Sequence, residues 1–404
     1  MMRQAQVVDD ALMEPAEAAL MERVHQLEGV IGEHRAWQEE NRRMAPQVVE
    51  ALSAAGLWGI FKPVELGGLE CNPVVGLKIF EEMSRIEPSV GWAVANQAGL
   101  DIFGVVLPEE GAKDAYADPA RPVAGGWFPP GQATPVEGGY RVTGRWAFAS
   151  NCHYAQYLTG MTVVVDDGKP RTSPDGSPVL MVVFFPPEEA EIIDTWHTMG
   201  MRGTGSHDIS VHEIYVPDRH SWIVSPLGLD RSGPFRTPLY NAFPWLMFAC
   251  LGPVGLGIGQ AAIDELIRLA GEKTPSYTDR CLRNREVAQS NVARAQAAIG
   301  AARAYLHQAV DRVHRTAQAG MRPALQDGIQ VQLAACNALD AGSKVLNLVH
   351  DTVGTSGIRQ EQRFEQLYRD GRTISQHAFA SLSRYESCGK VLFGLQSDWG
   401  FFYL

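Results

Sequence analysis

The sequence lacks the short motifs that mark the most frequent nucleotide and hydrolase sites. It contains no Gly-x-Gly-x-x-Gly on a strand-to-helix turn, no P-loop, no His-Glu-x-x-His and no nucleophile elbow. One glycine-rich run, "GLGIGQAA" (255–262), follows no convincing strand. We therefore interpret it as a place of close helix packing and not as a phosphate cradle.

Cysteine is scarce and has no metal-binding pattern. The six cysteines, at 71, 152, 250, 281, 336 and 388, form no Cys-x-x-Cys pair. They are typical of reduced, mostly buried thiols in a cytosolic protein. His207 and His212 lie in a strand pattern, where a period of two directs them to opposite faces. We expect no metal site.

An excess of basic residues is also missing. The 404 residues include 35 Lys and Arg against 46 Asp and Glu, a net charge of −11, which favours neither nucleic acid nor an anionic membrane surface. Acidic residues stand where a signal peptide would need an apolar run. The longest apolar stretch, 241–259, is broken by prolines and glycines. We expect a soluble cytoplasmic protein without a membrane segment.

Hydrophobic periodicity changes twice along the chain. Residues 1–120 contain good helix formers with apolar residues three and four apart, which predicts an N-terminal α-helical domain. Residues 121–232 change to a strand pattern rich in β-branched and aromatic residues, which predicts a central antiparallel β domain. The strand-like runs are 138–150, 157–167, 178–187 and 206–218.

The last region, 233–404, returns to helices with long apolar stripes and short links. This pattern is typical of a bundle, and we predict four helices, the last of them over 371–394. Helices, then strands, then helices indicate an α+β protein with a β module between two helical domains.

Three runs of the sequence resemble signatures of the acyl-CoA dehydrogenase family. Gly-Tyr-x-Val-x-Gly-x-Trp-x-Phe-x-Ser at 139–150 resembles the first β segment of that fold. "DTWHTMGMRGTGSHDISVHEIYVP" (194–217) resembles the second signature, and "VGTSGIRQEQRFEQLYRD" (353–370) resembles the C-terminal helix-turn-helix with its Arg-Asp pair. The runs occur in the family's order and spacing. The resemblance therefore implies the acyl-CoA dehydrogenase fold.

The position of the catalytic base separates the branches of this family. Dehydrogenases carry a Glu shortly after the Arg-Asp pair, whereas this chain has Gln376-His377-Ala378 there. The nearest Tyr-Glu pair, Tyr385-Glu386, follows about two helical turns later. Because a base must lie within hydrogen-bond reach of the proton that it removes, dehydrogenation is disfavoured.

A His in this setting resembles the flavin-dependent monooxygenases of the fold. These are oxygenase components of two-component systems, which take reduced flavin (FAD or FMN) from a separate NAD(P)H:flavin reductase. With O2 they form a C4a-hydroperoxide that must be shielded from water. The resemblance also implies a homotetramer, because the bundle packs against its mate and the flavin lies between subunits.

The resemblance further implies which residues form the site. Ser150 matches the hydroxyl that lies against flavin N5, and His377 is the candidate proton donor or acceptor, with a pKa near neutrality. The residues implied to bind the cofactor are Trp127, Phe128, Ser150, Trp196, Thr204, Ser206, Arg280, Arg283, Gly354, Thr355, Ser356, Arg369 and Asp370. From the residues alone, other interpretations stay open: a strand-end hydroxyl for Ser150, core packing for Trp196 and a solvated face for the arginines.

The substrate side departs from the pattern of phenol-oxidising members. Those enzymes have a second His about eight residues after the Trp matched here by Trp92. This chain has Leu100 there, with Asn96 and Gln97 as the nearest polar candidates. We take Asn96, Leu100 and His377 as the candidate substrate-binding residues. A substrate that needs no phenol deprotonation, such as a neutral heteroaromatic, a thioether or an amine, would suit this departure.

We therefore predict an oxygenase component that oxygenates a small aromatic, heteroaromatic, sulfur or amine substrate. Two alternatives remain at this point. One is an acyl-CoA dehydrogenase or oxidase whose base is displaced to Glu386. The other is a non-catalytic flavin-binding relative.

Overall fold

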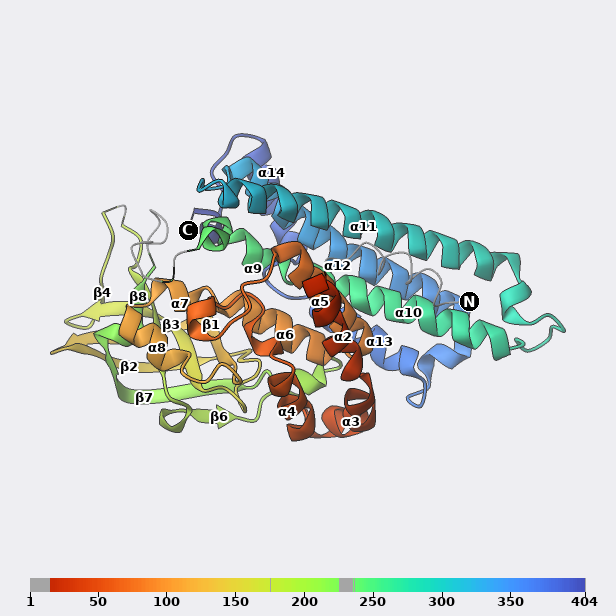
Figure 1. Ribbon diagram of the computed structural model, residues 1–404, viewed down its shortest axis with the longest axis horizontal. Helices are drawn as coiled ribbons and strands as arrows, with labels where there is room; N and C mark the ends of the chain where they lie inside the picture. Colours follow the sequence, from red (N-terminus) through yellow and green to blue (C-terminus); the bar gives the residue numbers. More distant parts are fainter. Residues whose placement is uncertain (1–14, 175, 225–234, 236, 404) are drawn as a thin grey trace.

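The computed structural model describes residues 15–403 except 175, 225–234 and 236 (Figure 1). Its N-terminal region is helical, as predicted. Every residue of α6 is buried except Asn96, so this helix lies at the centre of the molecule. The helices are α2 (Pro15–Gln26), α3 (Glu28–Asn41), α4 (Pro46–Ala54), α5 (Pro73–Ile86), α6 (Pro88–Leu100), α7 (Phe103–Val106) and α8 (Glu109–Ala115).

One sheet follows, in the strand order β6-β7-β2-β1-β3-β5-β8, with β4 paired to β3. The four predicted runs correspond to β2, β3, β5 and β7, which confirms them as strands. The bounds are β1 (Val123–Val136), β2 (Gly139–Trp146), β3 (Tyr157–Asp166), β4 (Lys169–Pro170), β5 (Leu180–Phe185), β6 (Glu191–Ile193), β7 (Asp208–Pro217) and β8 (Ser221–Ile223).

The prediction of a wholly antiparallel sheet was wrong. Strand β1 pairs with β3 in parallel, because the chain crosses from β2 on one side of β1 to β3 on its other side. Strand β1 itself was not predicted, since its sequence "VAGGWFPPGQATPV" is rich in glycine and proline. Its pairing with β3 shifts register between Gly126 and Gly131, and such an irregularity is where prolines are tolerated in a sheet.

The C-terminal region is a helical bundle, but the helix predicted over 371–394 is broken. Helix α13 ends at Ile374 and α14 begins at Leu382. In the break, the ring Nδ1 of His377 accepts a hydrogen bond from the backbone N–H of Phe379, which competes with helical pairing. The helices are α9 (Trp245–Ala249), α10 (Gly252–Glu272), α11 (Glu286–Gln318), α12 (Leu325–Val353), α13 (Arg363–Ile374) and α14 (Leu382–Leu392).

The glycine-rich run lies inside α10, and it packs against α12. A Cβ atom on Gly342 of α12 would lie 2.3 Å from the carbonyl oxygen of Gly255. Neither partner can move aside by a side-chain rotation, because the contact is between backbones. The interpretation of "GLGIGQAA" as close helix packing is thereby confirmed.

We expect Gly342→Ala to lower the free energy of unfolding by about 1–3 kcal/mol. An exposed helical Gly→Ala change gains up to about 1 kcal/mol, but overpacking against a backbone outweighs it. Chemical denaturation would measure the difference. Gly300→Ala is the control: a Cβ there meets nothing within 4 Å, so this variant should be no less stable than the wild type. Equal stabilities of the two variants would contradict the packing argument.

The segment Trp245–Glu272 is the one stretch of the described residues that is long and apolar enough to cross a membrane. However, 94% of its apolar window is buried inside the protein. The helix therefore forms the core of the bundle, as the prolines and glycines led us to expect.

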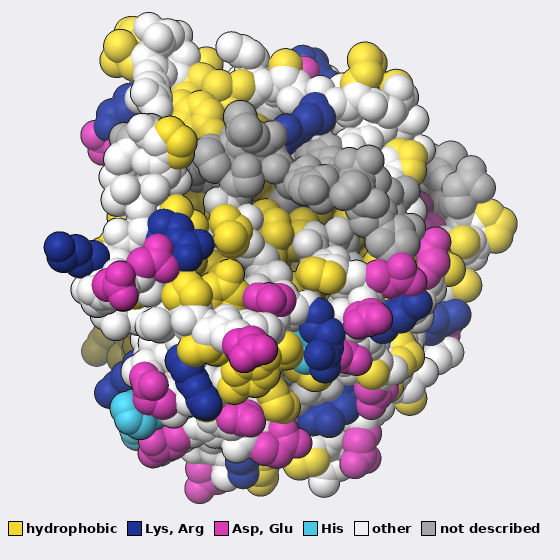
Figure 2. Space-filling view, turned by 90° about the vertical axis from the view of Figure 1, so that its left-hand side faces the viewer, with side chains coloured by type: hydrophobic (Ala, Val, Ile, Leu, Met, Phe, Trp, Pro, Cys, Tyr) yellow, Lys and Arg dark blue, Asp and Glu magenta, His cyan; other side chains and the backbone are white. Residues whose placement is uncertain are grey.

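The surface carries charges of both signs, and the two histidines of the 206–218 run differ in exposure. Acidic and basic side chains are mixed with apolar ones on the face at the sheet end of the molecule (Figure 2). His207 is buried and His212 is exposed, and no group of His, Cys, Asp and Glu in the described residues could hold a metal ion. All six cysteines are free, and four of them are buried.

Candidate active site

A chain of hydrogen bonds runs through three buried hydroxyl groups. Trp92 Nε1 donates to Ser150 Oγ (3.1 Å), which lies 2.7 Å from Ser206 Oγ. Ser206 Oγ lies 2.7 Å from Thr204 Oγ1, which donates to the carbonyl of Met201 (2.9 Å). A hydroxyl has one proton, so Ser206 must donate to Thr204 and Ser150 must donate to Ser206. Ser150 is thus left with a free lone pair and no free proton.

The turn that follows β2 positions Ser150. The side chain of Asn151 donates to the carbonyl of Ala93 on α6 (3.0 Å), and the backbone N–H of Ser150 donates to the carbonyl of Phe148 (2.9 Å). Asn151 has a φ of 69°, a left-handed conformation that Asn tolerates better than most residues. The turn therefore fixes Ser150 between α6 and the 204–206 segment.

His377 packs against the ring of Trp92. The two ring centroids are 5.0 Å apart in an edge-to-face arrangement. The structure therefore brings the two predicted catalytic residues together through Trp92, which the sequence offered only as a reference point for counting. A tryptophan in a helix that is buried at all but one residue carries no local signal of such a role.

The expectation of a near-neutral pKa for His377 was wrong. Burial lowers the pKa of this imidazole to about 4. The ring is therefore neutral near pH 7. Because Nδ1 accepts from Phe379, the proton of the neutral ring is on Nε2, and His377 presents an N–H donor.

Aromatic rings continue from His377. Phe379 lies 5.4 Å from the His377 ring and 5.9 Å from Trp127. Phe401 stacks on Trp127 at 5.8 Å with an interplanar angle of 11°. Trp127, predicted to contact the flavin, thus belongs to an aromatic cluster with Phe103, Phe379, Trp399 and Phe401. None of these four partners was predicted from the sequence, although "WGFFY" (399–403) is visibly rich in aromatic residues.

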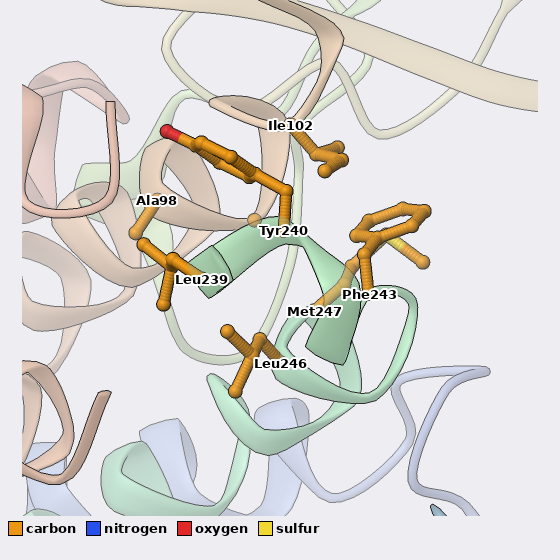
Figure 3. Close-up of a pocket in the computed structure, with 8 residues that line it drawn as sticks. Ala98, Ile102, Leu239, Tyr240, Phe243, Leu246 and Met247 are labelled. Atoms are coloured by element: carbon orange, nitrogen blue, oxygen red, sulfur yellow. The ribbon is translucent and has the colours of Figure 1, made fainter. Parts of the chain in front are cut away.

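Asn96 and Leu100 lie one and two turns beyond Trp92 on the same face of α6. Leu100 is buried, whereas Asn96 is half-buried and its side chain has no hydrogen bond to the described part of the chain. The next residues of α6 border a small apolar cavity of about 20 Å³. Figure 3 shows its lining from α6, from the link that follows α6 and from the 238–249 segment: Ala98, Gly99, Ile102, Leu239, Tyr240, Phe243, Leu246 and Met247.

Large apolar side chains remain exposed near Ser150. Phe128 is 76% exposed, Phe148 70% and Met199 52%. Phe148 stands edge-on to Trp196 at 6.1 Å, and Trp196 itself is buried, with its Nε1 bonded to the carbonyl of Met201. An exposed apolar face beside a buried hydroxyl with a free lone pair fits the flat ring of a flavin.

Five of the predicted cofactor residues lie elsewhere. They are at the end of the bundle opposite the sheet, where α10 turns into α11 and α12 ends (Figure 1). Lys273 joins the two segments by donating to Ser356 Oγ (2.8 Å). Within one chain this group and Ser150 do not meet. Its members are Arg280, Arg283, Gly354, Thr355 and Ser356.

The Arg369-Asp370 pair connects segments of the protein. Arg369 pairs with Glu39 (2.9 Å) and Glu365 (2.7 Å), and Asp370 accepts from the backbone N–H of Met201 (2.5 Å). A Cβ on Gly200 would lie 2.4 Å from the Arg369 backbone, so the loop approaches α13 closely. Both side chains are engaged in holding the 199–201 loop.

We expect Asp370→Asn to remove a pH dependence of stability. Burial, helped by nearby Glu87 and Glu39, raises the pKa of Asp370 to about 8. An acid whose pKa is raised in the folded state stabilises the fold fully below its unfolded pKa, near 4, and this contribution is lost as the pH rises towards 8. Denaturation midpoints at pH 5 and pH 8 would measure it. The Asn variant should lose less stability over that interval than the wild type; parallel losses would contradict the assignment.

Comparison with known proteins agrees with this arrangement. The family model for the acyl-CoA dehydrogenase N-terminal domain matches residues 15–109, and the model for the C-terminal domain matches residues 249–382. Indole-3-acetate monooxygenase of Pseudomonas putida is 30% identical over 362 residues, or 89% of each chain.

Two further proteins extend the comparison. The oxygenase component of the FADH2-dependent resorcinol hydroxylase of Rhizobium sp. is 25% identical and covers 84% of this chain and 85% of its own. The structure of XiaF from Streptomyces sp. with FADH2 and glycerol has a TM-score of 0.87 at 23% identity, covering 98% of this chain and 99% of that one. This last likeness shows the fold.

Proposed function

Because this chain belongs to the acyl-CoA dehydrogenase family, as a flavin-dependent monooxygenase of the oxygenase-component kind, we propose that its substrate is a fused heteroaromatic of the indole type. The observation that carries this proposal is a neutral, donor-bearing His377 between the Trp92–Ser150 pair and the aromatic cluster. Leu100 lies on the substrate side, at the position where phenol-oxidising members of the fold have a second His. A ring without an ionisable hydroxyl needs no base there.

Reduced flavin, when bound, supplies the electrons that activate O2. Ser150 would accept a hydrogen bond from N5–H of the reduced ring, since its own proton is committed to Ser206. Phe128 and Phe148 would cover the ring. The cofactor is FAD or FMN, delivered by a separate NAD(P)H:flavin reductase, and the free, mostly buried cysteines fit a cytoplasmic enzyme.

The protein's own residues orient the reaction. His377 would hold its Nε2 proton towards the oxygen atom that is transferred. Trp127, Phe379 and Phe401 would pack against the flat substrate and exclude water, which would otherwise divert the reaction to hydrogen peroxide. Asn96 supplies the remaining polar contact on the α6 face.

Dehydrogenation is less well supported by the same geometry. Glu386, the displaced base of that alternative, is exposed on α14, while the side chain at Trp92 is His377. A non-catalytic relative would not need the directed hydroxyl chain at Ser150.

A homotetramer would explain the residues at the far end of the bundle. Arg280 and Arg283 are too far from Ser150 along the bundle to serve the same flavin, but a neighbouring chain can bring them to it. Arg280 is exposed and bonded to Glu286 (3.0 Å), which a phosphate could replace. Light scattering of the purified protein tests the assembly.

The function is tested with reduced FAD or FMN, ¹⁸O2 and indole. We expect one ¹⁸O atom in the product and flavin-dependent turnover. Bleaching of bound oxidised flavin by an acyl-CoA, without incorporation of oxygen, would instead support the dehydrogenase. If neither oxygen incorporation nor bleaching were observed, only the non-catalytic relative would remain.

A further inference from the structure

The side chains of Arg384 and Trp399 form a stacked pair with unused hydrogen-bond donors. The guanidinium carbon of Arg384 lies 3.7 Å from the centroid of the Trp399 ring. Arg384 Nε and Nη1 and Trp399 Nε1 are buried, and none has a hydrogen-bond partner in the described chain. The one hydrogen bond of Arg384 runs from Nη2 to Ser383 Oγ (3.3 Å). Buried N–H groups normally have partners, so these three donors imply a missing acceptor.

This pair adjoins the aromatic cluster at the candidate active site. The Trp399 ring lies 5.5 Å from Phe379 and 4.9 Å from Phe401, and Phe379 contacts His377. Arg384 therefore stands two aromatic rings from His377. A planar substrate held against this cluster would bring its substituents within reach of the pair.

Asp398 and Glu386 raise the pKa of Arg384 through their charge, but neither is bonded to it. Asp398 is bonded to Lys390 (2.7 Å) and Ser387 (3.0 Å), and Glu386 is exposed on α14. Burial lowers the pKa of the Arg384 guanidinium, as expected for a cation without a bonded anion. Arg384 as a whole is only half-buried, but its Nε and Nη1 are buried and unpartnered. An acceptor that carries negative charge would satisfy these donors and offset the positive charge of the guanidinium at once.

We propose that Arg384 and Trp399 bind the carboxylate of an aromatic acid whose ring lies against the cluster that Trp127, Phe379 and Phe401 form. A carboxylate matches the geometry of adjacent guanidinium N–H groups, and the indole N–H of Trp399 adds a third donor. The inference rests on the proposed function, and it restricts the substrate class to heteroaromatic acids such as indole-3-acetate.

The test is a calorimetric titration of the full-length protein with indole-3-acetate and with its uncharged amide, indole-3-acetamide. The wild type should bind the acid about tenfold or more tightly than the amide, since hydrogen bonds to charged groups are the strong ones. Arg384→Gln should abolish this preference by weakening the acid alone. Trp399→Phe keeps the ring and removes one donor, so it should weaken the acid about threefold or more and leave the amide unchanged.

Lys344→Gln is the matched control, because it removes a cation from α12 whose side chain is 72% exposed. It should change neither affinity. Equal binding of acid and amide by the wild type would overturn the proposal, as would an Arg384→Gln variant that weakens both ligands alike, changes neither, or changes the oligomeric mass. Weaker binding of both ligands would indicate lost packing. Unchanged binding would indicate that a water near the unpartnered Gln332 Oε1 bridges the donors, and a changed mass would indicate a subunit contact. Binding needs no turnover, so a preference for the acid without oxygenation would refute the proposed function and leave the carboxylate site standing.

Discussion

His377→Ala should lower the rate of substrate oxygenation by about 100-fold or more, the range expected for a lost proton donor or acceptor. Reduced flavin should still bind, because the hydroxyl chain that includes Ser150 is intact. Product formation and hydrogen peroxide are measured in the same reaction. Electrons from the flavin should appear as peroxide in place of product. Unchanged product yield would remove His377 from the mechanism.

The low pKa of His377 gives this prediction a second part. Since its pKa is about 4, the ring is neutral at every pH above about 5. Oxygenation by the wild type should therefore not depend on this residue's titration between pH 6 and pH 8. His350→Ala is the control, because that ring also contacts two aromatic side chains, Phe364 and Tyr368, but lies at the other end of the bundle. It should leave the ratio of product to peroxide unchanged.

Ser150→Ala should weaken the binding of reduced flavin by about tenfold or more and change that of oxidised flavin little. The reason is the direction of the hydroxyl chain. Ser150 accepts from Trp92 and donates to Ser206, so it offers only a lone pair. Such a group can accept from N5–H of reduced flavin, but it offers no proton to the bare N5 of oxidised flavin. One hydrogen bond to a buried group is worth about 1–3 kcal/mol.

Ser206→Ala should act in the opposite way. It frees the Ser150 proton, which can then be donated to N5 of oxidised flavin, so the oxidised form should bind more tightly. Both variants reduce the preference for reduced flavin. Ser150→Ala does so by weakening the binding of the reduced form, and Ser206→Ala by strengthening that of the oxidised form. Anaerobic titrations with each form distinguish the two effects. Ser53→Ala is a matched control, since Ser53 also accepts from a tryptophan, Trp58 (3.1 Å), away from the site. Identical shifts in both variants would contradict the inferred direction.

The fold was predictable where the signal is local. Alternating residues identified β2, β3, β5 and β7, and the three family signatures fixed the order of the regions. The parallel pairing of β1 with β3 was not predictable, because it depends on which side of β1 the chain reaches after a long connection. The break before α14 was also not predictable, because helix-forming residues continue through it. The hydrogen bond from the backbone N–H of Phe379 to the His377 ring ends the helical pairing there.

In the candidate site, too, some residues were predictable from local sequence and others were not. Ser150, Thr204 and Ser206 belong to recognisable runs, and the structure joins them in one hydrogen-bonded chain. Trp92 and Arg384 lie in segments with no such pattern, and their partners come from distant parts of the sequence. Contacts of this kind arise from tertiary packing alone.

Helix α6 has a consequence for how substrates enter. It contacts α5, α9, α10, α13 and β1, and all but one of its residues are buried. A rod enclosed on every side cannot swing outward as a gate, so it acts as a fixed wall for the reactants. Any motion that admits a substrate must therefore come from segments other than α6, and Trp92 keeps its contacts with Ser150 and His377 throughout.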